Sequence, residues 1–302
     1  VDDALERFIG KIGDERVAQL VVLGLNHEQQ HQELILTDIK HAFFQNPLLP
    51  AYVAHRLQTV RHAPDMEWVD CPGRVAPIGH DGEDFAFDNE GPQHEVLLRP
   101  YRLASRPVTC GEYMSFMQDG GYTRPEFWLS DGWAMAQSEG WTAPLYWLDE
   151  GKMFTLNGVR PVSPDEPVTH VSLYEAAAYA AWAGKRLPTE FEWEAAAQDQ
   201  PMKGNFLDPM HVHPHSAATT GLTQLFGDVW EWTRSSYDPY PGFKPFDGSL
   251  AEYNGKFMVG QNVLRGGSCA TPAGHARATY RNFFPASARW QFSGIRLAED
   301  AA

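Results

Sequence analysis

The strongest structural signal in this chain is Lys185-Arg186-Leu187-Pro188-Thr189-Glu190-Phe191-Glu192-Trp193-Glu194. Within it, Thr189 is followed three residues later by Glu192, which is the spacing of a capping box at the start of a helix. The pattern therefore predicts a helix over residues 190–197. Further helices are predicted at 110–118 and 173–183, and strand-like runs alternate with Gly/Pro turns at 66–69, 75–79, 94–98 and 101–104. From residue 66 onward the chain is predicted to be a mixed α+β domain.

This α+β region carries eight short motifs in one order. They are Phe87–Glu90, Pro107–Thr109, Gly121-Tyr122, Pro167–Ser172, Lys185–Glu194, Gly227–Thr233, Val263–Ser268 and Gly294–Ala298. Each motif is weak alone, but the ordered series is specific. It resembles the formylglycine-generating-enzyme (sulfatase-modifying-factor) domain, a C-type-lectin-like fold, over residues 66–299. The resemblance implies that Asp228, Trp230, Trp232 and Arg265 define the fold.

Residues 1–60 are predicted to be helical and to form a separate unit. A short helix covers residues 4–9, and after a glycine break a long helix runs over 15–44 and stops before Pro47. Two helices make an incomplete bundle. Because the chain enters this pattern directly at Val1, we expect further residues of the bundle upstream.

Two histidines, His27 and His31, lie four residues apart in the long helix. Side chains at i and i+4 share one face of a helix, so two neutral imidazoles here can bind one divalent transition metal. A hydrogen-bonded histidine pair is one alternative, and the HExxH pattern of a zinc protease, with Glu28 as the general base, is another. We expect this face to turn into a helical bundle, because it also carries Leu20, Leu23, Gly24, Leu34, Asp38 and His41.

The long helix resembles the C-terminal half of a DinB-type four-helix bundle, whose His-x3-His-x-Glu motif matches His27, His31 and Glu33. A DinB bundle ahead of a formylglycine-generating-enzyme-like domain is the architecture of the EgtB-type sulfoxide synthases of ergothioneine biosynthesis, to which selenoneine synthases are related. The resemblance implies a non-haem iron(II) held by three histidines. Two of them match His27 and His31, and the third is expected upstream. It also implies that Gln30 contacts the substrate and that Glu33 is structural or supports the ligands. On the same resemblance the zinc-protease interpretation, in which Glu28 would be the general base, is rejected.

The reaction implied by the resemblance joins sulfur to the imidazole C2 of Nα-trimethylhistidine (hercynine), with O2 as co-substrate and a thiol as second substrate. A selenoneine synthase, which would use a selenosugar and form a carbon–selenium bond, is the alternative within the family. A non-catalytic, lectin-like small-molecule binding protein is the alternative from another class. Formylglycine generation is rejected, because no second cysteine follows Cys269 to complete a two-sulfur copper site.

The family's substrate segment matches Arg281-Asn282-Phe283-Phe284-Pro285, and the resemblance implies that Asn282 contacts the histidine derivative. A trimethylammonium group has no N–H donor, so aromatic faces hold it best. Phe283, Phe284 and Trp290 are candidates for such a cage, and core packing is the alternative for each. Some members carry Trp-Asp where this chain has Phe283-Phe284, so a carboxylate that would bind the amino group of γ-glutamylcysteine is missing.

Three more residues are candidates for the site. Arg281 and Arg289 are able to pair with a substrate carboxylate, and surface salt bridges are the alternative. The family's proton donor is a tyrosine in the loop before Leu264-Arg265-Gly266-Gly267-Ser268. Tyr253 is the candidate in this chain, whereas Leu250 aligns with the family's catalytic tyrosine.

Charge and composition narrow the range of partners. The net charge is −15, from 24 basic and 39 acidic side chains, and no block of Lys or Arg occurs. This excludes nucleic acid and anionic membranes as expected partners, and leaves small-molecule substrates. Three scattered cysteines and the absence of a secretory signal indicate a cytoplasmic protein without a disulfide framework.

Overall fold

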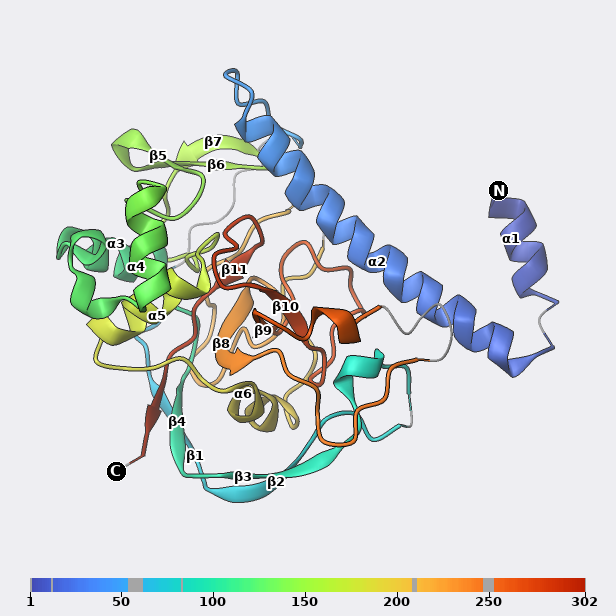
Figure 1. Ribbon diagram of the computed structural model, residues 1–302. Coiled ribbons are helices and arrows are strands. Elements are labelled where there is room, and N and C mark those ends of the chain that lie inside the picture. The colour runs from blue at the N-terminus through green and yellow to red at the C-terminus, as the bar shows by residue number, and fades with distance from the viewer. Residues whose placement is uncertain are drawn as a thin grey trace.

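The computed structural model describes residues 2–11, 13–53, 62–82, 84–207, 211–246 and 253–301. Two N-terminal helices, α1 (Asp2–Ile9) and α2 (Glu15–Phe44), precede a mixed body formed by the described residues from 62 onward. Asp14 caps α2, because its side chain accepts a hydrogen bond from the backbone N–H of Arg16. Figure 1 shows α2 lying across one side of the body, with its N-terminal end and α1 projecting beyond it. Both helices confirm the sequence prediction.

Among the described residues, the strands of the body form four small sheets. The largest, with strand order β10-β9-β8-β11, consists of β8 (Trp230–Ser236), β9 (Gln261–Arg265), β10 (Asn282–Pro285) and β11 (Ser293–Gly294). A second, with order β1-β4-β12, consists of β1 (Trp68–Cys71), β4 (Tyr101–Ala104) and β12 (Ala298–Asp300). The other two are the hairpin of β2 (Arg74–Ile78) and β3 (His94–Leu98), and the meander of β5 (Trp147–Leu148), β6 (Lys152–Thr155) and β7 (Gly158–Pro161).

Helices surround these sheets. They are α3 (Cys110–Gln118), α4 (Ser130–Ser138), α5 (Leu173–Trp182) and α6 (Glu190–Ala197). The predicted capping box begins α6: the Thr189 hydroxyl accepts from the backbone N–H of Glu192 at 3.1 Å, and the Glu192 carboxylate accepts from that of Thr189 at 2.7 Å. The predictions of α3 and α6 are confirmed at both ends.

The first and last residues of the strands were predicted less accurately than those of the helices. The first strand begins at Trp68 rather than at residue 66, because its residues pair in register with β4, from Trp68 opposite Ala104 to Cys71 opposite Tyr101. The sequence did not predict α4 or the β5–β7 meander. These elements are short, and a short strand takes its bounds from the length of its partner rather than from its own pattern.

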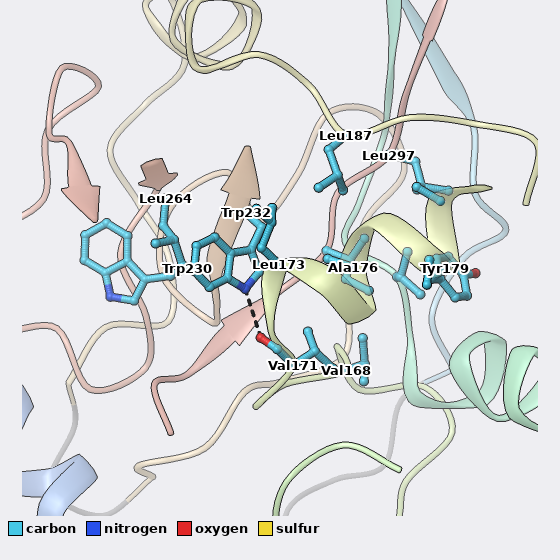
Figure 2. Packing of buried hydrophobic residues seen from close by; sticks show 14 of the residues in the cluster. Val168, Val171, Leu173, Ala176, Tyr179, Leu187, Trp230, Trp232, Leu264 and Leu297 are labelled. Carbon is cyan, nitrogen blue, oxygen red and sulfur yellow. Dashed lines mark hydrogen bonds between the residues drawn. The ribbon is translucent and has the colours of Figure 1, made fainter. Parts of the chain in front are cut away.

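The main hydrophobic core lies between α5 and the β10-β9-β8-β11 sheet. Figure 2 shows Trp230 and Trp232 of β8 beside Leu264, with Leu173 and Ala176 of α5 adjoining them. The Trp232 indole N–H donates to the backbone carbonyl of Val171 at 2.9 Å, so the buried ring keeps a partner for its polar atom. Other members of the cluster are Val168, Tyr179, Leu187 and Leu297.

Buried ion pairs join the sheets to α6. Arg296 donates to both oxygens of Glu231 on β8, and both side chains are fully buried. Arg265 on β9 pairs with Glu190 at 2.8 Å and Glu194 at 2.9 Å. Because an unpaired buried charge is strongly destabilising, these pairs explain why charged residues occur inside the fold motifs. The expectation that Asp228, Trp230, Trp232 and Arg265 are fold residues agrees with their burial.

Helix α2 packs on the body through a stripe that differs from the predicted one. Its buried residues are Leu23, Glu33, Leu36, Thr37 and Lys40. Leu20 and Asp38, which the spacing placed on the buried face, are exposed instead. The reason is that the body offers polar partners to Glu33 and Lys40, so the helix turns a polar stripe toward it. Apolar periodicity cannot predict such a face.

The organisation of the N-terminal part remains partly an expectation. The predicted boundary between residues 60 and 66 falls partly on residues 54–61, which lie outside the described residues. The described residues show two helices at this end, and a DinB-like bundle stays a prediction. None of the described helices combines the length and apolar character needed to cross a membrane.

Candidate active site

A cavity of about 340 Å³ lies where α2 meets the body. Helix α2 supplies one wall, and β8, β10 and the segment around Tyr253 supply the others. The predicted site residues that line it are His27, Gln30, His31, Tyr253, Arg281, Asn282, Phe283 and Phe284. Arg289 and Trp290 are not part of this lining. The structure therefore brings most of the predicted residues together at one junction.

The two histidines converge at this cavity. Their Nε2 atoms are 3.1 Å apart, and the rings meet edge to face with centroids 4.5 Å apart. Two imidazole nitrogens bound to one metal at about 2.0–2.1 Å each lie roughly 3 Å apart, so this separation fits a shared metal ion. It also fits a hydrogen bond between one protonated and one unprotonated nitrogen.

The surroundings of His27 favour its neutral imidazole. Burial lowers the pKa of His27, and neighbouring His31 lowers it further, while Glu28 raises it. Metal binding requires unprotonated nitrogen, so this direction suits a ligand. Across the described residues, no group of three or more His, Cys, Asp or Glu side chains is arranged to hold a metal. The residues present therefore fit two of three ligands.

Gln30 is held between two tyrosine hydroxyls. Its Oε1 accepts a hydrogen bond from the Tyr253 hydroxyl, and its Nε2 donates to the Tyr280 oxygen at 2.6 Å. The amide orientation is therefore set by residues of the body, and one amide N–H remains for a ligand. Tyr280 was not predicted from the sequence. Its position directly before Arg281-Asn282 is the signal that points to it.

A histidine continues this hydrogen-bond chain behind Tyr280. The Tyr280 hydroxyl lies 3.2 Å from Nε2 of His275, and Nδ1 of His275 lies 3.0 Å from Oε1 of Gln29. Burial, with a contribution from Arg277, lowers the pKa of His275 to about 4, so its ring is neutral at physiological pH. Nδ1 then carries the proton toward Gln29, and Nε2 accepts from Tyr280. Sequence reasoning also missed His275.

Tyr253 contacts the histidine pair directly. Its ring packs edge to face on His27, with centroids 5.2 Å apart, and stacks on Phe87 at 5.6 Å. Burial raises the pKa of Tyr253 above its usual value, so the phenol keeps its proton at neutral pH. Leu250, the residue that aligns with the family's catalytic tyrosine, lies outside the described residues.

The aromatic candidates of β10 do not form one cage. Phe283 stacks on Tyr237, with centroids 4.0 Å apart, whereas Phe284 packs edge to face on Trp290 at 4.7 Å. Successive residues of a strand point to opposite sides, which separates the two phenylalanines. Both still border the cavity, so the aromatic surface expected for a trimethylammonium group is divided between them. On Asn282, Oδ1 accepts from the backbone N–H of Phe283 at 2.9 Å.

Both candidate arginines are already paired within the protein. Arg281 donates to Glu190 through Nε at 2.8 Å and through Nη2 at 3.0 Å. Arg289 donates to Glu175 in the same two-pronged way, at 2.9 and 2.8 Å. Salt bridges, which were the alternative to a substrate carboxylate for both arginines, are therefore present, and they are largely buried rather than at the surface.

Comparison with known proteins shows the family of the chain. Residues 58–215 and 200–301 match the family described as sulfatase-modifying factor enzyme 1-like domain. A hercynine oxygenase of Mycolicibacterium smegmatis is 36% identical over 308 residues, which cover 92% of this chain and 71% of that protein. The chain belongs to the EgtB-like family of hercynine oxygenases. A second member, from Mycobacterium tuberculosis, is 37% identical over 313 residues, covering 95% of this chain and 72% of its own length.

A solved structure supports the fold of the body. Variable protein 1 of Treponema denticola superposes with a TM-score of 0.53 and 18% sequence identity, over 79% of this chain and 100% of that one. At this identity the likeness concerns the fold alone. Together with the family match, it confirms the prediction of an α+β domain related to the sulfatase-modifying factor.

Proposed function

We propose that this EgtB-like protein is an enzyme of ergothioneine biosynthesis that uses O2 to form a carbon–sulfur bond at the imidazole C2 of hercynine. The observation that carries the proposal is the convergence of His27 and His31 on one point of the cavity, with nitrogens 3.1 Å apart. Gln30 and Tyr253 line the same cavity and are hydrogen-bonded to each other. Identity of 36–37% to two hercynine oxygenases supports the same substrate.

His27 and His31 would hold an iron(II) ion as two of the three histidine ligands that the family resemblance implies. When bound, iron would supply the one-electron chemistry with dioxygen that protein side chains cannot perform. The two imidazoles are presented on one face of a single rigid helix, which fixes their separation before a metal arrives. A site built on a helix keeps its geometry better than one built on loops.

The remaining walls of the cavity would bind and orient hercynine. Its trimethylammonium group has no N–H donor, so the aromatic surface of either Phe283 or Phe284, both of which border the cavity, would suit it. The free amide N–H of Gln30 and the amide of Asn282 are placed to hydrogen-bond the substrate's polar groups. The Tyr253 ring packs on His27 and its hydroxyl donates to Gln30, and we propose that this hydroxyl protonates the reacting centre.

The second substrate is a thiol or a selenosugar. Position 284 is phenylalanine here, and it packs on Trp290. An aromatic ring cannot pair with the amino group of γ-glutamylcysteine, so this residue favours a second substrate other than that dipeptide. A selenosugar, which would make the product a selenoneine precursor, is the alternative.

Turnover of the protein with anaerobically added iron(II), hercynine and O2 tests the proposal. Cysteine, γ-glutamylcysteine and a selenosugar are supplied in turn, products are identified by mass spectrometry, and iron is measured by elemental analysis. We expect a C2-linked product with one of the three. His27→Ala and His31→Ala should lose both iron and product. The matched control is His62→Ala, whose side chain is 94% exposed and distant from the cavity lining.

Failure of all three second substrates would overturn the enzyme proposal. Hercynine binding without turnover or iron would then leave a lectin-like binding protein as the better description.

A further inference from the structure

Glu33 is a largely buried residue of the cavity wall, and its carboxylate is tied to two separate segments of the body. Oε1 accepts hydrogen bonds from the indole Nε1 of Trp230 on β8 and from the Ser268 hydroxyl, both at 2.7 Å. Oε2 accepts from the Thr271 hydroxyl at 2.8 Å. Glu33 is 5% exposed, and these three partners are fully buried or nearly so.

Packing alone does not explain a carboxylate at this position. Moving it out of water is costly, and three hydrogen bonds from neutral donors offset that cost only in a defined orientation. A leucine would fill similar space without this demand. The carboxylate can fix the orientation of α2, because its two oxygens must meet donors on β8 and on the loop after β9 at the same time.

The orientation of α2 matters because the candidate metal ligands are on the same helix. Glu33 follows His31 by two residues and lies on the side of α2 that faces the body. An imidazole nitrogen lies roughly 6 Å from the helix axis, so rotation of α2 by roughly 20° would displace it by about 2 Å. Both imidazoles would move together, so the displacement would shift them relative to Tyr253 and to any metal ligand from outside α2, by more than the roughly 0.5 Å that a coordination site tolerates.

The anchor is also connected to Gln30. Trp230, which donates to Glu33, packs its ring on Tyr280 with centroids 5.5 Å apart. Tyr280 in turn accepts the hydrogen bond from Gln30. A closed circuit therefore runs from Glu33 through Trp230 and Tyr280 back to the same helix at Gln30, three residues earlier. Two points of attachment on one side of a helix fix its rotation as well as its position.

We propose that Glu33 is a positioning residue, which sets the rotation of α2 and so holds His27 and His31 in the arrangement that binds metal. This inference rests on the metal site of the proposed function. It assigns a role to the glutamate of the His-x3-His-x-Glu motif, which the sequence left open between a structural part and support of the ligands.

The test compares Glu33→Leu, Glu33→Gln and a matched control, Thr37→Val. Thr37 is 1% exposed in the same buried stripe, but its hydroxyl donates to Leu34 of its own helix, so it does not tie α2 to the body. Co(II) affinity is measured by titration of its absorption bands, and melting temperature is measured alongside. Hydrogen–deuterium exchange of residues 27–33 reports whether the helix stays seated.

Glu33→Leu should lose Co(II) affinity by about 10- to 100-fold, and its amides at residues 27–33 should exchange faster. Glu33→Gln keeps one oxygen acceptor and the shape of the side chain, so it should stay within about threefold of the wild type in affinity. Thr37→Val should leave both the Co(II) affinity and the exchange at residues 27–33 unchanged, even if its melting temperature falls as far as that of Glu33→Leu.

Two results would overturn the proposal. One is equal loss of affinity in Glu33→Leu and Thr37→Val at matched melting temperature, which would indicate general destabilisation. The other is unchanged exchange at residues 27–33 in Glu33→Leu. If the wild type binds no Co(II), the metal site of the proposed function fails, and the exchange experiment still decides whether Glu33 seats the helix.

Discussion

The amino nitrogen of Lys40 lies 2.5 Å from Nε2 of His170, and neither side chain is exposed. The rings of Tyr146 and Phe292 each have their centres 4.8 Å from the same nitrogen. Burial lowers the pKa of Lys40 to about 7, against a smaller opposing influence of Cys269. Burial, with a contribution from Lys40, also lowers the pKa of His170 well below its usual value. Helix α2 is thus seated at its C-terminal half by a buried amine.

Replacing Lys40 by methionine should stabilise the protein at neutral pH. The folded state, in which the pKa of Lys40 is about 7, holds fewer protons on this residue than the unfolded state, in which the pKa has its ordinary value of 10.5. The free energy of unfolding from this group therefore rises with pH between about 7 and 10.5, and the penalty is fully present below pH 7. Lys40→Met should raise the free energy of unfolding at pH 7 by about 1–4 kcal/mol and flatten that rise.

Urea denaturation at several pH values between 6 and 10 measures this effect. Lys203→Met, which removes an exposed lysine, is the control and should leave the pH dependence unchanged. A loss of stability in Lys40→Met at every pH would contradict this prediction. It would show that the contact with His170 stabilises the fold by more than the burial of the amine destabilises it.

Gly266 and Gly274 offer a comparison of backbone crowding at equal strain. Both have positive φ, +103° and +82°. A Cβ at Gly266 would lie 2.4 Å from the carbonyl oxygen of Leu225, whereas one at Gly274 would meet nothing within 4 Å. Gly266→Ala should therefore destabilise the protein by roughly 2–4 kcal/mol more than Gly274→Ala. Thermal unfolding of the two variants side by side checks this, and equal melting temperatures would contradict it.

Loss of Arg281 should affect stability rather than substrate recognition. Its guanidinium donates hydrogen bonds to Glu190 and to the backbone carbonyls of Asn89 and Asp238. Removing one partner of a buried ion pair leaves an uncompensated charge, so Arg281→Met should cost about 3–5 kcal/mol. Arg234→Met, at an exposed position of β8, is the control. If Arg281→Met keeps its melting temperature but has a raised KM for hercynine, Arg281 binds the substrate, and this prediction is wrong.

Tyr253→Phe tests the proton donor. The substitution keeps the ring that packs on His27 and Phe87 and removes only the hydroxyl. If Tyr253 protonates the reacting centre, product formation should fall by about 10²-fold or more, with a much smaller change in KM. Steady-state turnover measures both constants, and Tyr52→Phe, at an exposed tyrosine, serves as the control. Full activity in Tyr253→Phe would remove this residue from the mechanism.

The residues of α2 show how far sequence reasoning reached. Its bounds at Glu15 and Phe44 and the i, i+4 spacing of His27 and His31 are local properties, so both were predictable. The buried stripe was not, because it includes Glu33 and Lys40, whose burial depends on donors and rings from distant parts of the chain. Charged residues are mostly exposed, so the sequence predicts exposure for a charged residue in a helix unless its buried partners are known.

The substrate segment shows the converse limit. Asn282, Phe283 and Phe284 were identified by family resemblance, and they do border the cavity. Arg281 belongs to the same segment, but Glu190 occupies its guanidinium from 91 residues away. An arginine in a motif supports ligand binding and ion pairing equally, and only the neighbours in space distinguish the two.

The sequence by itself determined the helices with caps and regular spacing, the α+β character of the body, and the histidine pair. These depend on contacts within a few residues, which the order of side chains fixes. Only the tertiary structure decided that Gln30 is held between Tyr253 and Tyr280, 223 and 250 residues away, and that Glu33 meets Trp230 across 197 residues. Hydrogen bonds are short and directional, so their partners are known only once the chain has brought distant segments together.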